Sequence, residues 1–452
     1  MSVEDTLDVK QTLYDRVIQK RDSLARVIEV TSQQATNPHD HKVGRVFMPR
    51  EVAELMGCST SYVSTLTQAI ADDVPKDERS GYRCYSLAHI TELRKEAAKR
   101  VSDQPQKALR YFPRRREDEE LAVMAFVNFK GGSAKTTTSV HFAQYAALQG
   151  YRVLFLDLDP QGSASTIFGY QPVLIEPDQS VNAALRYEDP LSIRDVIQKT
   201  YFEGIDIGLG GQWMTEWEQD TPRVMTDAHH YRHYIDQRTA ELQQALALGA
   251  SEAEVVEMRR ELAELEQLDQ KGAAALHYYM RLRSCLDEVE DDYDIVVCDT
   301  QPALNFATQA TIGAANHLLL TIQPDWLDVK SMHQYLCALG DHLATLEDSV
   351  HIVGDSARYT DRTMNCLLTR FKPNDAAMTA IASMMRSCLD DVLENQMPVS
   401  AAVSQAGLSN STIYETNGKD FNRATFKRGV EAMSQVNAEI EKIICKGWGR
   451  DV

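Results

Sequence analysis

The stretch NFKGGSAKTTTS, from Asn128 to Ser139, follows without a break on the apolar run LAVMAFV. Its paired glycines allow a tight backbone turn whose N–H groups point at an anion, and the helix expected after them directs its positive N-terminal end to the same place. Lys135 adds a mobile positive charge, and Thr136 adds a hydroxyl suited to a magnesium ion. The stretch therefore predicts a phosphate-binding loop between a buried strand and a helix.

The spacing of this loop differs from that of a standard P-loop, which has glycine six residues before the lysine and again directly before it. Phe129 and Ala134 occupy those two positions, and a second lysine, Lys130, precedes the glycine pair. The pattern resembles the deviant Walker A motif, K-G-G-x-x-K-[ST], of the ParA/MinD family of ATPases. Ala134 departs from the glycine most common in that family, but it keeps a small residue at this position.

The resemblance implies that the loop holds ATP and that Lys130 reaches across a homodimer to the nucleotide of the partner subunit. It also implies that Lys130 and Lys135 take part in catalysis. The nucleotide-binding residues that it implies in this loop are Lys130, Gly131, Gly132, Ser133, Ala134, Lys135, Thr136 and Thr137.

A second motif, DLDPQGSAS, follows the apolar stretch Tyr151 to Leu156. Strand, helix and strand at this spacing form a βαβ unit, which brings both strand ends to the same edge of a parallel sheet. Asp157 and Asp159 therefore come close to the phosphates. The run resembles the second motif of the ParA family, which implies that Asp159 positions or activates the attacking water and lies beside the metal. A solvated carboxylate is the alternative, more so for Asp157.

A third apolar stretch, YDIVVCDT, ends in Asp299 and Thr300. An acid at the end of a buried strand resembles the Walker B aspartate, which holds Mg²⁺ or its water shell. The implied cofactors are ATP and Mg²⁺, with Thr136, Asp159 and Asp299 as the metal-binding residues. Gln301 departs from the family, which usually has proline there, and leaves the conformation of this loop open.

Two more apolar stretches, HLLLTI from His317 and MNCLLT from Met364, raise the expected sheet to at least five strands. The predicted fold class is α/β, a doubly wound and mainly parallel sheet of the P-loop NTPase type with its ligand at the carboxyl ends of the strands. An N-terminal α-helical, winged helix-turn-helix domain precedes it. By resemblance, Thr369 and Pro398 border the adenine.

The composition sets limits on the class of protein. A chain of 452 residues predicts two or three domains, and no run of about 18 apolar residues suggests a membrane span. The eight cysteines form no C-x-x-C pair, which favours reduced thiols over zinc or disulfides. Residues 1–116 carry 20 Lys and Arg against 16 Asp and Glu, whereas the remainder has a net charge of −23. We expect a cytoplasmic, nucleoid-associated protein whose basic head meets nucleic acid.

The first 116 residues predict two parts. Residues 1–45 contain an amphipathic helix over 5–30, which either packs on its own domain or mediates dimerisation. Residues 46–116 predict two short helices around Gly57, followed by a wing and a linker, as in winged, MerR-like DNA readers. A plain helical hairpin without a ligand is the alternative. The candidate DNA-binding residues are Thr60, Ser61, Tyr62, Ser64, Gln68 and Arg83.

The rest of the chain, residues 117–452, predicts the ATPase domain. A charged segment at about 213–275 predicts an inserted antiparallel helical hairpin, in which Gly249 ends the first helix, Ser251 caps the second, and Leu246 and Leu248 face the second helix. The sequence does not reveal its function. The linker ahead of the domain contains Arg114 to Arg116, which could contact phosphate. Basic residues gather in the C-terminal part, where they form either a sequence-independent DNA surface or solvated helix faces: Arg370, Lys372, Arg386, Lys419, Arg423, Lys427 and Arg428.

The resemblance covers nearly the whole chain and predicts a plasmid or chromosome partition ATPase of the large, autoregulating ParA type. ATP closes the dimer, the dimer binds DNA without sequence preference, and a ParB-type partner stimulates slow hydrolysis. The operator-binding head represses the protein's own operon. The alternatives are a nucleotide-sensing repressor without a transport role, or a metabolic or redox enzyme on the same fold. Because no cysteine occupies a cluster-binding motif, the redox version is disfavoured.

Overall fold

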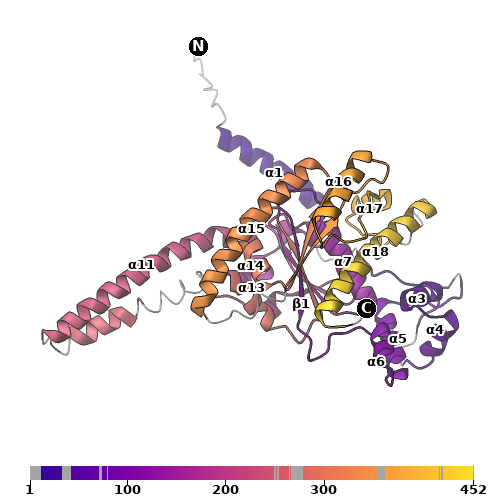
Figure 1. The fold of residues 1–452 in the computed structure, drawn as a ribbon, viewed down its shortest axis with the longest axis horizontal. Coiled ribbons are helices and arrows are strands. Elements are labelled where there is room, and N and C mark those ends of the chain that lie inside the picture. Colours follow the sequence, from indigo (N-terminus) through magenta and orange to yellow (C-terminus); the bar gives the residue numbers. More distant parts are fainter. Residues whose placement is uncertain are drawn as a thin grey trace, which may run out of the picture.

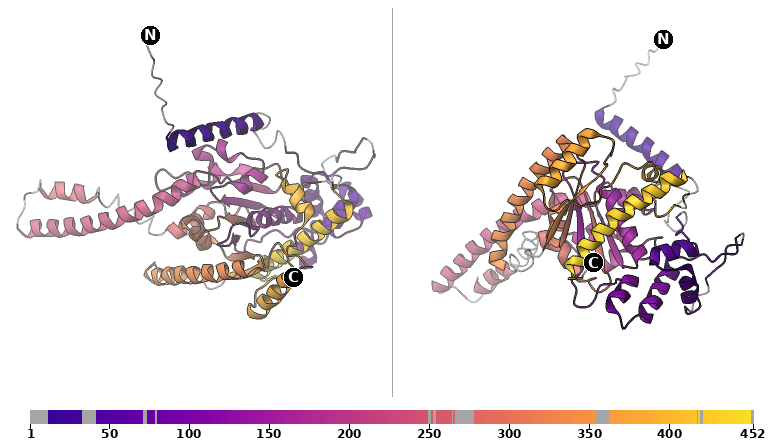
Figure 2. Two further views of the ribbon diagram at one scale, coloured as in Figure 1. Left: turned by 90° about the horizontal axis from the view of Figure 1, so that it is seen from above. Right: turned by 45° about the vertical axis from the view of Figure 1, so that its right-hand side comes forward.

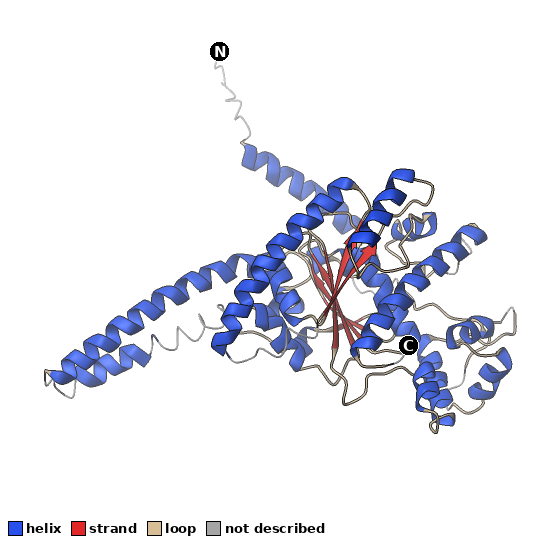
Figure 3. Ribbon diagram, viewed as in Figure 1, coloured by secondary structure: helices blue, strands red, loops and turns tan. Residues whose placement is uncertain are grey.

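A computed structural model gives the architecture of the chain, in which a twisted sheet lies between layers of helices (Figures 1 and 3). It describes residues 12–32, 42–70, 74–78, 80–248, 251, 254–263, 265, 278–353, 362–416, 418 and 421–450. None of the helices in these ranges is long and apolar enough to cross a membrane.

Among the described residues, seven strands form one sheet in the order β3-β4-β2-β5-β1-β6-β7. All neighbouring strands are parallel except β3 and β4, which are antiparallel. The sequence predicts the five other strands but neither of these two. The strands are β1 (Ala122–Val127), β2 (Val153–Leu158), β3 (Gln198–Lys199), β4 (Ile205–Gly208), β5 (Ile295–Thr300), β6 (His317–Ile322) and β7 (Thr363–Leu368).

Both faces of the sheet are covered, as a parallel sheet requires. Alternate residues of β1 point to opposite faces, so Met124 and Phe126 join one core and Val123 and Ala125 join the other. On the first face lie α7 (Lys135–Gln149), α8 (Ser163–Ile167), α17 (Ala401–Gly407) and α18 (Arg423–Gly447). On the second lie α9 (Asn182–Leu185), α10 (Ile193–Val196), α13 (Tyr278–Asp287), α14 (Phe306–Ala314), α15 (Trp326–Val353) and α16 (Ala376–Cys388).

Residues 42–111 contain the predicted pair of short helices, α3 (Pro49–Met56) and α4 (Thr60–Thr67). Gly57, with a φ of 60°, ends α3, and the Ser59 hydroxyl accepts a hydrogen bond from the Tyr62 N–H at the start of α4. An antiparallel bridge between Lys76 and Arg83 makes a short hairpin at the place of the predicted wing. Two further helices follow, α5 (Leu87–Arg100) and α6 (Pro105–Tyr111).

Helix α1 (Leu13–Ser32) confirms the amphipathic helix expected near the N-terminus, although residues 5–11 of that prediction lie outside the described residues. Three of its apolar side chains are largely exposed: Leu13 is 78% exposed, Val17 is 55% exposed and Leu24 is 63% exposed. The described residues of the chain therefore leave the apolar side chains of Leu13, Val17 and Leu24 uncovered.

The head packs on the ATPase body through the buried guanidinium of Arg94, on α5. It donates to the Leu55 carbonyl of α3 (2.9 Å), to the Tyr111 carbonyl of α6 (3.1 Å) and to the Gln149 side chain at the end of α7 (3.3 Å). Burial lowers the pKa of Arg94 to about 10, and the charge of Glu441 acts against this shift. One side chain thus joins two head helices to the helix that begins at the phosphate loop.

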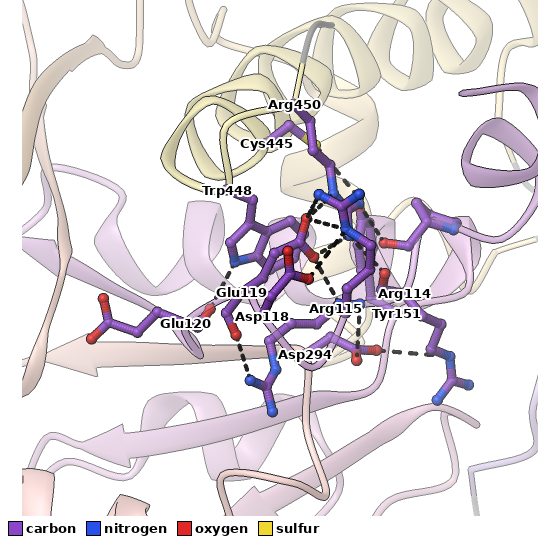
Figure 4. Close-up of polar contacts among 12 residues, drawn as sticks. Arg114, Arg115, Asp118, Glu119, Glu120, Tyr151, Asp294, Cys445, Trp448 and Arg450 are labelled. Carbon is purple, nitrogen blue, oxygen red and sulfur yellow. Dashed lines mark hydrogen bonds and ion pairs between the residues drawn. The ribbon is translucent and has the colours of Figure 1, made fainter. Parts of the chain in front are cut away.

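The segment between head and body has the composition of a flexible linker, but the structure holds it firmly (Figure 4). Arg450 donates to the Pro113 carbonyl (2.9 Å) and the Arg114 carbonyl (2.7 Å), and it forms an ion pair with Glu119 (2.6 Å). Arg115 donates to the Glu119 carbonyl at 2.6 Å. Arg114 donates to the Gly150 carbonyl at 2.9 Å, and Arg116 forms an ion pair of 2.8 Å with Glu119. The three arginines that the sequence suggests for phosphate contact thus bind protein groups in this structure.

We predict that Arg450→Ala lowers the free energy of unfolding by about 3 kcal/mol, because it removes one of the two guanidinium groups that pair with the buried Glu119 carboxylate and also the donor to the Pro113 and Arg114 carbonyls. The side chains of Arg450 and Glu119 are only 6% and 3% exposed, so water does not replace the lost contact. Urea denaturation followed by tryptophan fluorescence measures the change, since the Arg450 guanidinium lies 4.4 Å from the Trp448 ring centre. Arg428→Ala, on the exposed surface of α18, is the control, and an equal effect of both variants would contradict the prediction.

The predicted helical insertion is an arm, defined here as residues 214–263, that projects from the body (Figures 1 and 2). Its first helix is α11 (Met214–Ala247), and residues 254–263 return as a helix alongside it, joined by an ion pair of 2.9 Å between Arg238 and Glu261. Ser251 caps the returning helix as expected, whereas Gly249 lies outside the described residues. Leu246 and Leu248 were expected between the helices, but they are 49% and 79% exposed, because they lie at the far end where few residues cover them.

Candidate functional site

The phosphate loop lies between the end of β1 and the start of α7, at the carboxyl edge of the sheet. The Asn128 side chain anchors its first residues, because its amide donates to the Thr321 carbonyl of β6 and its oxygen accepts from the Lys130 N–H at 3.0 Å. Thr369 anchors its other end by donating to the Ser133 carbonyl at 2.9 Å. The loop is thus held from β6 and from the segment that follows β7.

Two residues of the loop adopt left-handed backbone angles. Gly132 has a φ of 79°, which glycine adopts freely, whereas Ala134 has a φ of 65° although it carries a Cβ. This conformation costs an alanine about 1 kcal/mol. The geometry explains why glycine suits this position and shows that Ala134 keeps the same turn with a small strain.

Lys135 and Asp299 lie close together in the interior of this edge. Burial lowers the pKa of Lys135, and the negative charges of Asp299 and Asp159 act in the opposite direction. Burial, together with the charge of Asp157, raises the pKa of Asp299, while the Thr136 hydroxyl and the Lys135 charge act to lower it. The predicted phosphate-binding lysine and the predicted metal-binding residues Thr136, Asp159 and Asp299 are therefore brought together.

The carboxylate of Asp299 fits a metal ion. It is fully buried, and neither of its oxygens has a hydrogen-bond partner in the part of the chain that the structure describes. A buried acid without partners is costly unless a cation or a ligand satisfies it. Carboxylate and hydroxyl oxygens are ligands that Mg²⁺ prefers, so Asp299 and Thr136 form a suitable pair.

Asp157 and Asp159 have different surroundings. Asp157 pairs in register with Asp299 on the neighbouring strand, and its carboxylate accepts hydrogen bonds from the N–H and the hydroxyl of Ser165, each at 2.7 Å. Burial raises its pKa to about 6. Asp159, two residues further along the chain, is half-buried, and its carboxylate accepts a hydrogen bond from the Gln161 N–H at 2.9 Å. Asp157 therefore fixes the loop that follows β2, while the Asp159 carboxylate remains accessible at the edge of the sheet where the phosphate loop lies.

The ammonium group of Lys130 forms an ion pair with Asp328, near the start of α15. The Asp328 side chain is only 4% exposed and that of Lys130 is 42% exposed, so the pair lies at the surface of the site. The sequence does not identify Asp328, because the contact joins positions 198 residues apart. Lys130 is held within its own subunit in this structure.

Thr369 and Pro398 lie on neighbouring backbone segments beyond β7, since Phe371 and Pro398 form a parallel bridge. Arg370 was grouped with the basic residues of the C-terminal part. The structure instead places its guanidinium on the phosphate loop, where it donates to the Gly132 carbonyl at 3.1 Å. The sequence feature that could have predicted this contact is the place of Arg370 just after the carboxyl end of the buried strand β7.

The candidate DNA-binding residues of α4 lie mostly on one exposed side. Thr60, Ser61, Ser64 and Gln68 are exposed, while Val63 and Leu66 on the opposite side are fully buried. Tyr62 is half-buried, with its ring 6.3 Å from that of Tyr111, and Arg83 is half-buried in the short hairpin.

The basic residues of the C-terminal part are scattered. Arg386 donates to the Leu393 carbonyl at 3.2 Å, and Lys427 pairs with Glu431 on α18. Lys372 is exposed in the segment after β7, and Arg423 and Arg428 are exposed near the start of α18. Lys419 lies outside the described residues.

A phosphate loop with two buried anchors, a buried lysine and an unsatisfied acid at the end of the adjacent strand define the class of the protein. It is a P-loop nucleotide-binding protein with a doubly wound sheet.

Comparison with known proteins agrees with this class. A family model described as an AAA domain matches residues 121–352. "Putative replication protein A" of Sinorhizobium fredii is 35% identical over 441 residues, which are 97% of this chain and 95% of that protein. Protein SopA of Escherichia coli K12 is 24% identical over 72% of this chain and 70% of SopA. A solved structure named "Partition Protein" covers 97% of this chain and 99% of its own, with a TM-score of 0.59 and 17% identity, and so shares the fold.

The chain belongs to the ParA-type family of partition ATPases. Members of this family are nucleotide-hydrolysing P-loop proteins that bind nucleotide and Mg²⁺, and the arrangement of Lys135, Thr136 and Asp299 agrees with that chemistry.

Proposed function

We propose that this protein hydrolyses ATP to drive the segregation of a plasmid or chromosome, as a homodimer that acts on DNA together with a ParB-type partner. The observation that carries the proposal is the convergence of Lys135, Asp159 and Asp299 at one edge of the sheet, with Lys130 at the surface beside them. The names of the relatives, SopA among them, support a role in partition.

In this proposal each residue of the site has a distinct task. The backbone N–H groups from Gly131 to Thr137 and the Lys135 ammonium bind the phosphates, because phosphoryl transfer depends mainly on alignment and on stabilising negative charge. Thr136 and Asp299 hold Mg²⁺, which supplies further positive charge at the phosphates when bound. Asp159 positions the attacking water and accepts its proton. Thr369 and Pro398 border the adenine.

Dimer closure requires Lys130 to leave its ion pair with Asp328. Its side chain is 42% exposed, so it is able to swing outward, and a nucleotide on a second subunit offers phosphate oxygens in place of the Asp328 carboxylate. Because Lys130 exchanges one anionic partner for another, its movement from Asp328 to the partner subunit costs little free energy. ATP bound to the partner subunit supplies the phosphate oxygens that take the place of Asp328.

We predict that Lys130→Ala abolishes ATP-dependent dimerisation while ATP binding to the monomer stays within about threefold, because Lys135 and the loop amides remain. Sedimentation velocity with a non-hydrolysable ATP analogue measures dimerisation, and a fluorescent analogue measures binding. Lys95→Ala, on the exposed side of α5, is the control. Dimerisation and hydrolysis at the normal level in Lys130→Ala would exclude the role across the dimer.

The head is proposed to read DNA. The exposed side of α4 offers hydroxyl and amide groups to base edges, and Arg83 in the adjoining hairpin offers a charge to the backbone. Binding to an operator through Thr60, Ser61, Tyr62, Ser64, Gln68 and Arg83 would let the protein repress its own operon. The exposed stripe of α1 supports a second dimer contact, between the heads of two subunits.

The ATP-bound dimer is further proposed to bind DNA without sequence preference, which keeps the protein on the nucleoid in the cytoplasm. The exposed basic residues of α18 and of the segment after β7 supply the charges, and such binding weakens steeply with salt.

The ATPase rate, measured alone, with DNA, with a ParB-type partner, and with both, tests the proposal. Partition requires slow basal turnover that DNA and partner together raise by more than the product of their separate effects. The alternative, a nucleotide-sensing repressor without a transport role, predicts operator binding that depends on nucleotide but no such synergy.

A further inference from the structure

The arm is inserted into the ATPase fold between β4 and α13, and both of its feet contact one helix, α14. The first foot is the start of α11, where Trp217 and Thr221 are buried. The second foot is defined as the start of α13, at Tyr278, the helix that follows the arm in the described part of the chain. Helix α14 is the first helix after the strand that ends in Asp299 and Thr300. The arm is therefore attached next to the catalytic edge of the sheet.

The first foot grips the N-terminus of α14 through Glu218. One carboxylate oxygen accepts from the Ala307 N–H at 2.7 Å, and the other accepts from the Phe306 N–H at 3.1 Å. These N–H groups lack partners within the helix, and the helix dipole favours a negative charge at this end. The neighbouring Trp217 ring is 1% exposed and stacks on Tyr187, with ring centres 6.4 Å apart. The foot is thus rigid where it holds α14.

The second foot reaches the same place from the other side. The Tyr278 ring packs edge-on against Phe306 with centres 5.0 Å apart, and its hydroxyl donates to the side chain of Gln309. The amide of Gln309 in turn donates to the Leu304 carbonyl at 2.9 Å. Both feet therefore fix the segment from Leu304 to Ala307.

This segment is the end of the loop that follows β5, the strand whose last two residues are Asp299 and Thr300. The beginning of the loop is fixed to the sheet, because the Thr300 hydroxyl donates to the Phe126 carbonyl at 2.8 Å. Between the two anchors lies Gln301, whose buried amide nitrogen has no hydrogen-bond partner among the described residues. The course of the loop beside the metal-binding carboxylate is therefore set by the sheet at one end and by the arm at the other.

We propose that the arm is a control element of ATP hydrolysis, in which Glu218 and Tyr278 are positioning residues for the loop from Gln301 to Asn305, which directly follows Asp299 and Thr300. A change in the orientation of α11 reaches this loop through Glu218, while Tyr278 holds the same end of α14 from the other side. The proposal rests on the ATPase activity proposed above. It gives the arm a role in setting the rate of hydrolysis, whereas nucleotide binding is left to the phosphate loop.

The expected effect falls on turnover and leaves nucleotide affinity nearly unchanged. ATP is bound mainly by the phosphate loop, whose anchors Asn128 and Thr369 lie on the other side of the site. A shift of the loop from Gln301 to Asn305 by about 1 Å changes the surroundings of the Asp299 carboxylate and lowers the rate by up to about 100-fold. The affinity for ATP, by contrast, depends little on that loop.

The first test compares Glu218→Gln with Glu216→Gln, an exposed glutamate one position before Trp217. Glu218→Gln turns one acceptor toward an N–H group into a donor, so kcat should fall about tenfold while the affinity for a fluorescent ATP analogue stays within twofold. Tyr278→Phe removes only the hydroxyl and should lower kcat less. The double variant should lose less than the product of the two single effects, because both act on one loop. Equal loss of affinity and kcat would indicate a merely structural role and would overturn the proposal.

The second test uses the reciprocity of coupling, since a loop that responds to the arm must also affect it. Amide hydrogen exchange of residues 214–224 should slow when a non-hydrolysable ATP analogue and Mg²⁺ bind to the wild-type protein. The same ligands should produce no such slowing in Glu218→Gln. If wild type and Glu216→Gln hydrolyse ATP but Glu218→Gln matches them in kcat and exchange, the control role is wrong. If neither wild type nor Glu216→Gln hydrolyses ATP, the proposed function itself fails.

Discussion

Replacing Lys135 with alanine is expected to weaken ATP binding by about 100-fold or more and to abolish ATP-dependent dimerisation with it. The ammonium group lies between the phosphate loop and the carboxylates of Asp159 and Asp299. Hydrogen bonds from a charged group contribute about 1.5–3 kcal/mol each, and about 1.4 kcal/mol corresponds to a factor of ten in affinity.

The variant also removes the positive charge that faces the acids. Burial already raises the pKa of Asp299, and the loss of the Lys135 charge should raise it further. More Asp299 is then protonated at neutral pH, so Mg²⁺ competes with a proton and binds less well. The loss of affinity in Lys135→Ala should therefore diminish as the pH rises, because deprotonation restores the carboxylate.

Titration with a fluorescent ATP analogue at several pH values measures both effects. Lys99→Ala, on the exposed side of α5, is the control, and circular dichroism of each variant shows whether the fold persists. ATP binding by a folded Lys135→Ala protein within about threefold of wild type would show that Lys135 does not bind the phosphates.

The central part of the fold could be predicted because its signals are local. The strands β1, β2, β5, β6 and β7 are continuous apolar runs, and the phosphate loop carries its glycines and lysines within twelve residues, 128–139. Strands β3 and β4 could not be predicted, since β3 has two residues and β4 is four residues that end in a glycine. Strands this short form because a neighbouring strand is present, so their own sequence contains little information.

The surroundings of the site depend on contacts that the sequence does not reveal. Asp157 and Asp159 look equivalent in DLDPQG, and only the hydrogen bonds from Ser165 separate the loop-shaping acid from the accessible one. The ion pair between Lys130 and Asp328 joins residues far apart in the chain. The composition of the segment between head and body does not predict that it is held firmly, for the same reason. The Arg450 side chain that holds it comes from a distant part of the chain.

Replacing Asp159 with alanine is expected to lower kcat by about 100-fold or more while leaving ATP affinity nearly unchanged, which traps an ATP-bound dimer. General-base catalysis by a positioned side chain contributes about 10²–10⁴-fold. Asp159 is half-buried at the phosphate edge, and its carboxylate also accepts from the Gln161 N–H, which fixes its orientation. The loop amides and Lys135, which bind the phosphates, remain in place.

Two comparisons separate this role from a structural one. Asp159→Asn keeps the shape and the hydrogen bond from Gln161 but cannot accept a proton, so it should be nearly as slow as alanine. Asp157→Asn should instead lower the free energy of unfolding, because Asp157 is fully buried and accepts two hydrogen bonds from Ser165. Single-turnover hydrolysis, dimer lifetime on the ATP analogue and urea denaturation measure the three quantities. Rapid turnover by Asp159→Asn would remove proton acceptance from the role of this residue, and the water would then have to be activated by the phosphate itself.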